Sequence, residues 1–160
     1  MNMKRIILII AGIATFSAFS CSKKPDTGGT AAEKFANEWY VTLYKAGTPG
    51  PSHAHMYTYN TSANSNEIWL DDDGNVYEFK FKATVDLGSL TFSASNVTNQ
   101  WPSYPIKINV TDGKIIPDAG RSKTGNVTDS IYMKITFSDD PGVNYELKGH
   151  ARTRFSEDDY

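Results

Sequence analysis

The stretch Val76–Leu87, VYEFKFKATVDL, carries the clearest periodic pattern in the sequence of 160 residues. Apolar and polar side chains alternate along it, and a period of two residues is typical of a β-strand with one face in the core. At about 3.3 Å per residue the stretch would span about 40 Å, which is longer than most strands. A strand this long must curve, so the pattern predicts a barrel or a strongly coiled sheet. The face expected to point inward carries Tyr77, Phe79, Phe81, Ala83, Val85 and Leu87.

Shorter alternating stretches fill the rest of the chain and are separated by turn residues. The pairs Asp73-Gly74 and Asp112-Gly113 are typical of tight hairpins, because both residue types tolerate positive φ. Residues 117–128 have the composition of a polar loop, and a helical turn is expected only near Glu33. The other strands are expected at 38–45, 53–60, 67–70, 90–97, 106–110, 114–116, 129–138 and 143–155.

These strands predict an all-β fold. Stretches with helical periodicity between the strands would favour a parallel sheet, and none is found. We expect a single antiparallel up-and-down barrel of about eight strands, since closure removes the exposed edges that such aromatic strands would present. A β-sandwich is the alternative. The same alternation is compatible with a hollow interior and with a packed one.

The first 20 residues are typical of a secretory leader. Lys4 and Arg5 precede a short apolar run, which is too short for a permanent membrane span, and small residues lead up to Cys21. Because Cys21 is the only cysteine, no disulfide partner exists, and the arrangement resembles that of a bacterial lipoprotein precursor. We expect a signal peptide at 1–20, a lipidated Cys21 with a flexible tether at 21–33, and the barrel domain at 34–160. An ordinary secretory leader is the alternative.

The net charge and the absence of common catalytic motifs argue against nucleic-acid binding and give no support for catalysis. Removal of Lys4 and Arg5 with the leader takes the formal net charge from −2 to −4, which is unfavourable for a nucleic-acid surface. No G-x-S-x-G or H-E-x-x-H motif occurs, so we assign no catalytic residue and expect no cofactor.

Metal binding is a possibility that the sequence raises without supporting it strongly. His53 and His55 are two residues apart on an expected strand and could hold zinc with His150. Polar alternation on an outer strand face is the simpler interpretation. Asp71–Asp73 lacks the later glycine and glutamate of a calcium loop, so a hairpin is favoured there. We therefore expect no metal site.

Several longer blocks resemble a known family. Tyr59–Asn75, Phe81–Asn96, Gly125–Gly142 and Tyr145–Phe155, together with Asn37–Thr42, are similar to the Bacteroidetes lipoprotein family called lipid-binding putative hydrolase. The resemblance covers almost the whole mature chain. It implies a lipocalin-like, calycin-type barrel and a bound lipid or other apolar molecule, and it supplies no catalytic motif.

The leading hypothesis is a lipoprotein of the cell envelope, anchored to the outer membrane, that binds a lipid or other small apolar ligand inside the barrel. One alternative is an interaction or glycan-capture module with a packed barrel, acting through loops that carry Trp101 and Tyr104. A hydrolase is the third possibility. The residues expected to contact the ligand are Tyr77, Phe79, Phe81, Val85, Trp39 and Trp101.

Overall fold

A computed structural model describes residues 29–160 and shows one antiparallel sheet closed into a barrel. Neighbouring strands follow the order of the chain, and β1 pairs with β9 to close the ring. Eight strands form the barrel, and the two-residue β2 pairs only with the end of β1. The strands are β1 (Asn37–Lys45), β2 (Thr48–Pro49), β3 (Ala54–Asn60), β4 (Glu67–Asp71), β5 (Lys80–Asp86), β6 (Thr91–Thr98), β7 (Lys107–Arg121), β8 (Val127–Phe137) and β9 (Tyr145–Ala151).

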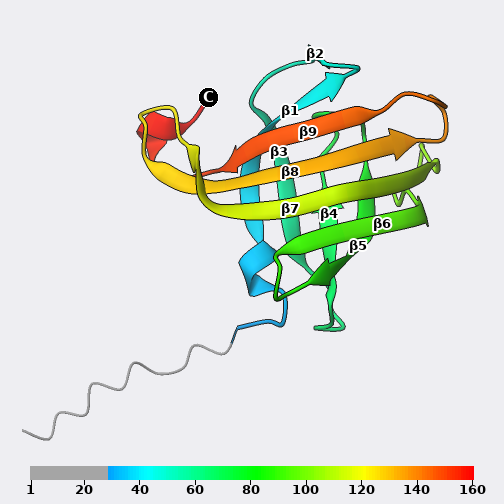
Figure 1. Ribbon diagram of the computed structural model, residues 1–160, viewed down its shortest axis with the longest axis horizontal. Helices are drawn as coiled ribbons and strands as arrows, with labels where there is room; N and C mark the ends of the chain where they lie inside the picture. The colour runs from blue at the N-terminus through cyan, green and yellow to red at the C-terminus, as the bar shows by residue number, and fades with distance from the viewer. Residues whose placement is uncertain (1–28) are drawn as a thin grey trace, which may run out of the picture.

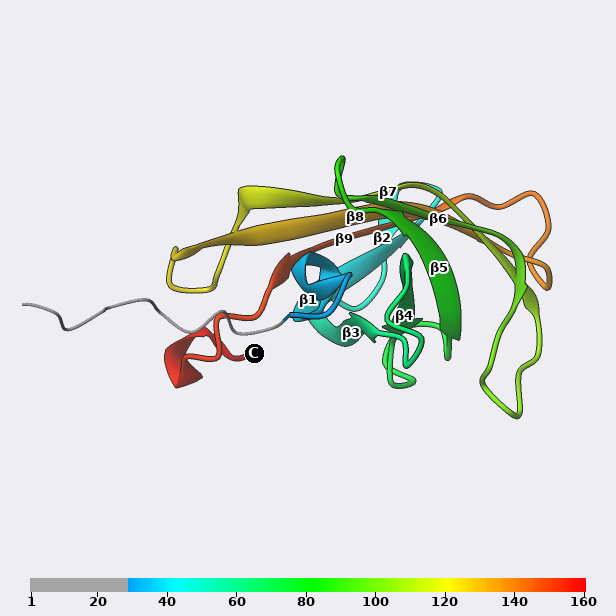
Figure 2. The ribbon, with the colours of Figure 1, turned by 90° about the horizontal axis from the view of Figure 1, so that it is seen from below.

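The predicted all-β, up-and-down antiparallel barrel is therefore confirmed. In Figure 1, β7, β8 and β9 cross in front of β1, β3 and β4, so that the barrel consists of two facing layers. Figure 2, seen from below, shows β5 and β6 joining these layers on one side. Within residues 29–160, no helix is long and apolar enough to cross a membrane.

The 3₁₀ turn η2 (Glu33–Phe35) covers one end of the barrel, which we call the base. Phe35 is fully buried, and its ring packs edge-on against Phe92 with 6.5 Å between centroids. The Trp39 indole donates a hydrogen bond of 2.7 Å to the buried hydroxyl of Thr58, which donates in turn to the Phe35 carbonyl. The helical turn expected near Glu33 is thus tied to the core.

Side chains fill the centre of the barrel. Phe79, Phe81 and Met56 have no accessible surface, so no space the size of a water molecule adjoins them. Apolar residues of β8, including Ile131 and Met133, are buried to the same extent. Such close packing is normal for a protein interior. It means that a ligand reaches the central residues only if part of the barrel moves.

The strand predicted over Val76–Leu87 is shorter than expected. β5 begins at Lys80 and ends at Asp86, while Glu78 has φ of +54° and interrupts the extended backbone. Residues 72–79 form instead a loop whose backbone N–H groups bind a carboxylate rather than a neighbouring strand. Leu87 lies in the following turn and is 37 % exposed. The prediction that Phe79, Phe81, Ala83 and Val85 point inward is confirmed.

The hairpin predicted at Asp112-Gly113 is also wrong. β7 continues through this pair for 15 residues, and the register shift between Thr111 and Lys114 marks a β-bulge. A Cβ on Gly113 would lie 2.4 Å from the Phe92 carbonyl oxygen, so glycine is required by a close contact and not by a turn. The predicted loop 117–128 is likewise mostly strand, because β7 runs to Arg121 and β8 starts at Val127.

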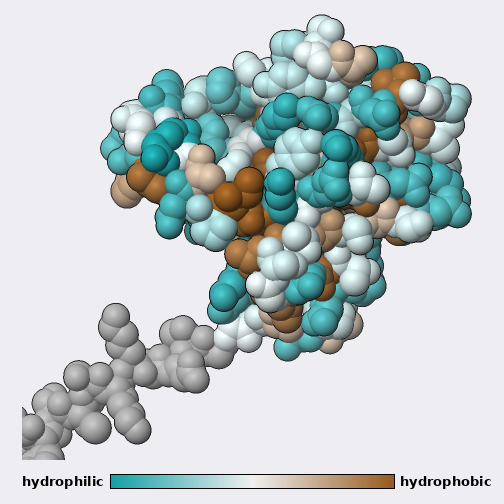
Figure 3. All heavy atoms as spheres, in the orientation of Figure 1, coloured by the Kyte–Doolittle hydropathy of each residue, from teal (hydrophilic) through white to brown (hydrophobic). Residues whose placement is uncertain are grey.

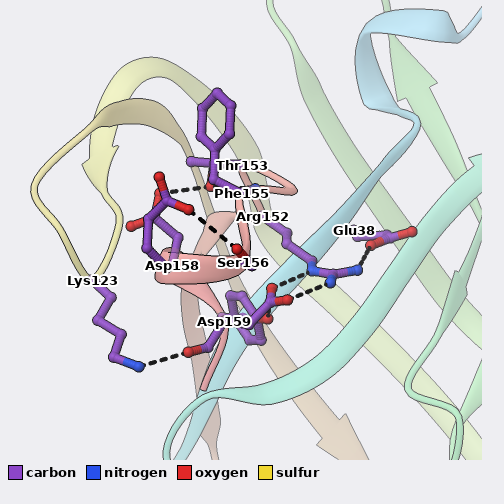
Figure 4. Close-up of polar contacts among 10 residues, drawn as sticks. Glu38, Lys123, Arg152, Thr153, Phe155, Ser156, Asp158 and Asp159 are labelled. Atoms are coloured by element: carbon purple, nitrogen blue, oxygen red, sulfur yellow. Dashed lines mark hydrogen bonds and ion pairs between the residues drawn. The ribbon is translucent and has the colours of Figure 1, made fainter.

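The C-terminal segment folds back onto the outside of the barrel, where η3 (Ser156–Asp158) meets the turn between β7 and β8 (Figure 4). Arg152 binds the Asp159 carboxylate with two hydrogen bonds of 2.8 Å and Glu38 with a third. The Tyr40 hydroxyl also donates to Asp159, at 2.8 Å. Asp158 is buried and accepts hydrogen bonds from the backbone and hydroxyl of Thr124.

We call residues 152–160, which bind the outside of the barrel in this way, the C-terminal clasp. We expect the clasp to open in acid. Hydrogen bonds from Arg152 and Tyr40 lower the pKa of Asp159 to about 2. A lowered pKa in the folded state stabilises the clasp above the unfolded carboxyl pKa of about 3.9, and that contribution is lost as the pH falls toward 2. An NMR titration of the Asp159 carboxyl carbon should therefore show a midpoint near 2. In Arg152→Ala the midpoint should rise toward the ordinary value, and an ordinary midpoint in the unmodified protein would contradict the arrangement.

Candidate functional site at the mouth of the barrel

The end of the barrel opposite η2, which we call the mouth, is covered by residues 72–79, which we call the mouth loop. Asp72 has no exposed surface. Its Oδ1 accepts hydrogen bonds from the backbone N–H groups of Gly74 and Phe79, at 3.0 and 2.9 Å. Its Oδ2 accepts from Val76 and Tyr77, at 3.2 and 2.6 Å. One carboxylate thus takes the place of a neighbouring strand as the acceptor for this loop.

The environment of Asp72 is consistent with this role. Burial raises the pKa of its carboxyl group, although the hydrogen bonds from Tyr77 and Gly74 favour the charged form. The Asp72 N–H also donates to the Phe79 carbonyl at 3.1 Å, so the two ends of the loop are joined.

A second buried polar side chain, Asn99, links the mouth loop to the adjacent loop between β6 and β7. Its amide nitrogen donates to the carbonyls of Glu78 and Tyr104, at 2.8 and 2.9 Å. Its amide oxygen accepts from the backbone of Lys80 at 2.8 Å and of Trp101 at 3.3 Å. Asn99 therefore holds two loops of the mouth in a fixed relation.

Aromatic rings close the mouth under these loops. The Tyr77 ring is stacked on Phe137 with 3.8 Å between centroids and an interplanar angle of 6°. Tyr145 meets both rings edge-on, at 5.5 and 5.3 Å. Trp101 lies against the mouth loop, since a Cβ on Gly74 would be 3.4 Å from its ring. The aromatic cluster separates the packed core from solvent.

An apolar groove of about 410 Å³ opens beside the mouth loop, and we call it the mouth groove. Volumes of roughly 300–1,000 Å³ are typical of small-molecule sites. Its walls come from β1, β2, the following turn, β3 and the mouth loop. The residues that line it are Leu43, Lys45, Thr48, Pro49, Gly50, Pro51, Ala54, Asn75 and Val76.

A larger groove of about 740 Å³ lies on the outer side of β5 to β8, and its lining is different. Hydroxyl and charged side chains such as Thr84, Thr91, Lys114 and Tyr132 dominate it. The outer face carried by β7, β8 and β9 is mostly hydrophilic in Figure 3. The mouth groove is therefore the better candidate site for an apolar molecule.

The structure brings only some of the predicted ligand contacts to this site. Tyr77 and Trp101 lie at the mouth and are half-buried. Phe79 and Phe81 belong to the packed core directly below, with ring centroids 5.5 Å apart. The Trp39 indole is engaged by Thr58. Val85 is 4 % exposed and lies on β5 near the base. Ligand contact by these residues stays a prediction, as does lipidation of Cys21, which lies outside the described residues.

The three histidines meet on the outside of the barrel, and none of them lines the mouth groove. The His53 and His150 rings are 6.4 Å apart, and His55 packs edge-on against Tyr40 at 4.8 Å. Tyr160 stacks on His53 with 3.6 Å between centroids. Among residues 29–160, no group of three or more His, Cys, Asp or Glu side chains is placed to hold a metal ion.

Sequence reasoning missed the residues that build the mouth. Asp72 was interpreted as one of three turn aspartates, yet it is buried while Asp73 is exposed. The weak signal available was the pair Asp72 and Gly74 followed by an apolar run, which also fits an ordinary hairpin. Asn99 gave no signal, because two of its four partners, Glu78 and Lys80, lie 21 and 19 residues earlier in the chain.

Comparison with known proteins identifies a family for this chain. A family model described as lipid-binding putative hydrolase matches residues 24–156. The chain belongs to this family. A search of curated proteins finds no match. Among solved structures, one similar chain is a structural-genomics protein of unknown function from Bacteroides ovatus, determined at 2.40 Å. Identity is 13 % and the TM-score 0.45, over 74 % of this chain and 42 % of that chain. The family assignment and the barrel both fit lipid binding.

Proposed function

We propose that this protein is a lipoprotein of the cell envelope that binds a lipid or another small apolar molecule at the mouth of its barrel. The observation that carries the proposal is the mouth groove, which is walled by Leu43, Pro49, Ala54 and Val76 and closed on one side by the mouth loop. Family membership supports lipid as the chemical class. The ligand's chain would lie along Val76 and reach Phe79 and Phe81 if Tyr77 leaves its position over Phe137.

The leader and Cys21 support an anchor in the outer membrane through attached acyl chains. Two or more chains hold a protein stably at a bilayer, at about 0.8 kcal/mol for each buried methylene. Gly29, where the described part begins, precedes η2 at the base. An anchor at Cys21 would therefore connect to the base and leave the mouth groove at the other end of the barrel.

A binding measurement on protein lacking residues 1–21 tests the proposal. We expect saturable binding of an uncharged fluorescent lipid probe and its displacement by unlabelled apolar molecules. Val76→Asp places a charge in the mouth groove and should weaken binding at least tenfold, or about 1.4 kcal/mol. Ile116→Asp is the matched control, because Ile116 is 39 % exposed outside the groove. Equal affinity in both variants would exclude the mouth groove as the site, and no saturable binding under delipidated conditions would count against the function.

A further inference from the structure

We call the edge of the mouth that carries Lys45, Tyr104, Asp139, Asp140 and Tyr145 the rim. One part of it holds an ammonium group between a carboxylate and an aromatic ring. Lys45 lines the mouth groove, and its Nζ lies 2.6 Å from Asp140 Oδ2. The same nitrogen is 5.6 Å from the centroid of Tyr145, whose hydroxyl donates to Asp140 at 2.5 Å. A cation held by a carboxylate and a ring face is stabilised by both the ion pair and the cation–π attraction.

Next to this ion pair, the rim carries a second carboxylate and further tyrosine rings, but no lysine or arginine of the described residues pairs with that carboxylate. Asp139 accepts a hydrogen bond from the Tyr104 hydroxyl, and no lysine or arginine within residues 29–160 forms a salt bridge with it. The Tyr104 and Tyr77 rings are 6.2 Å apart and inclined by 45°. Because Tyr104 binds Asp139 and its ring lies beside that of Tyr77, the carboxylate and the two rings belong to the same part of the mouth. Burial and the charge of Asp139 raise the pKa of Tyr77.

Acidic groups outnumber basic ones around the mouth. Lys45 and Lys80 are neutralised by Asp140 and Asp71. Lys107, at the start of β7, donates to the Thr98 hydroxyl. Asp73, Glu78 and Asp139 form no salt bridge within the described part of the chain. The local field therefore favours a positive group and disfavours a carboxylate or phosphate at the rim.

We propose that the mouth recognises an amphiphile whose polar group is a primary or quaternary amine. The apolar chain occupies the mouth groove, and the ammonium group lies beside Asp139 with the Tyr77 and Tyr104 rings around it. This inference rests on the proposed function and adds the class of head group to it. Lys45 supplies the link between the two parts, since it borders the groove and binds Asp140 of the rim.

Three ten-carbon probes with different polar groups test the inference: decyltrimethylammonium, decanol and decanoate, each below its micellar concentration. Calorimetry should show the ammonium probe binding about tenfold more tightly than decanoate, equivalent to about 1.4 kcal/mol, with decanol between them. Asp139→Asn should weaken the ammonium probe about tenfold and leave decanol unchanged. Glu157→Gln removes the same charge in the C-terminal clasp region and should change none of the three affinities.

The outcomes separate the two proposals. If none of the three probes binds, the proposed apolar function fails and the head-group inference fails with it. If decanol binds and the ammonium probe is no tighter than decanoate, only the head-group inference is overturned. An equal effect of Asp139→Asn and Glu157→Gln would also overturn it, because net charge would then explain the preference. Tetramethylammonium alone should bind at least tenfold more weakly than decyltrimethylammonium, and equal affinity would point to a free amine as the ligand and refute the two-part site.

Discussion

Replacing Asp72 with asparagine is expected to destabilise the protein by about 2–4 kcal/mol, since each buried N–H left without an acceptor costs on the order of 1–3 kcal/mol. The carboxylate offers two oxygens to four backbone N–H groups. An asparagine keeps one oxygen, and its NH₂ group must face either Gly74 and Phe79 or Val76 and Tyr77. In both orientations donors face donors, so half of the mouth loop loses its support.

Urea unfolding measures the stability loss, and hydrogen exchange at Val76 and Tyr77 shows where it arises. Exchange should accelerate in the mouth loop and much less at Ile131 or Met133 in β8. Asp73→Asn is the matched control, because Asp73 is exposed and asparagine tolerates its φ of +48°. We expect the control to change stability by less than about 0.5 kcal/mol. Equal losses in the two variants would show that Asp72 does not hold the loop.

Gly149→Ala is expected to cost about 3 kcal/mol or more, because it forces the strands apart where the barrel closes. Gly149 of β9 pairs with Val41 of β1. A Cβ there would lie 2.3 Å from the Tyr40 carbonyl oxygen and 2.6 Å from Val41 Cγ1. The backbone oxygen cannot move without disturbing the β1–β9 ladder that completes the ring.

Gly88→Ala provides the comparison for this change. A Cβ on Gly88 would be 3.4 Å from Asp86 Oδ1, which is an ordinary contact. Its unfolding midpoint in urea should stay close to that of the unmodified protein, whereas that of Gly149→Ala should fall clearly. A Gly149→Ala protein as stable as Gly88→Ala would mean that β1 and β9 are farther apart than described.

The alternation of apolar residues predicted the inner face of the barrel well. Ile131, Ile135 and Leu147 alternate with polar residues along their strands, and each is fully buried. This succeeded because burial on one side of a strand imposes the period of two directly on the sequence. The number and order of strands followed from short connections between antiparallel neighbours.

The errors arose where one distant group overrides the local pattern. Val76–Glu78 alternate as a strand does, but the Asp72 carboxylate binds their backbone. Asp112-Gly113 fits a hairpin turn, but contact with Phe92 places Gly113 inside a long strand. Such effects depend on residues that are remote in sequence, so periodicity does not reveal them.

The candidate site could be predicted only in part, for a similar reason. Trp101 and Tyr77 were expected near a ligand from their aromatic character and their positions in the chain. The groove walls Leu43, Pro49 and Ala54 come from separate segments and were interpreted as strand and turn residues. Only closure of the sheet brings them together with Val76. Whether the interior is filled or hollow was likewise undetermined until side-chain burial was known.

An amide NMR titration of the protein with decanol tests the central claim most directly, since it locates an apolar ligand without assuming its head group. We predict saturable shifts at Ala54, Asn75, Val76 and Tyr77, with little change at Phe35 of the base or at Thr91 of the polar outer groove. Saturable shifts centred on Phe35 or Thr91, with the mouth unaffected, would contradict an apolar site at the mouth of the barrel.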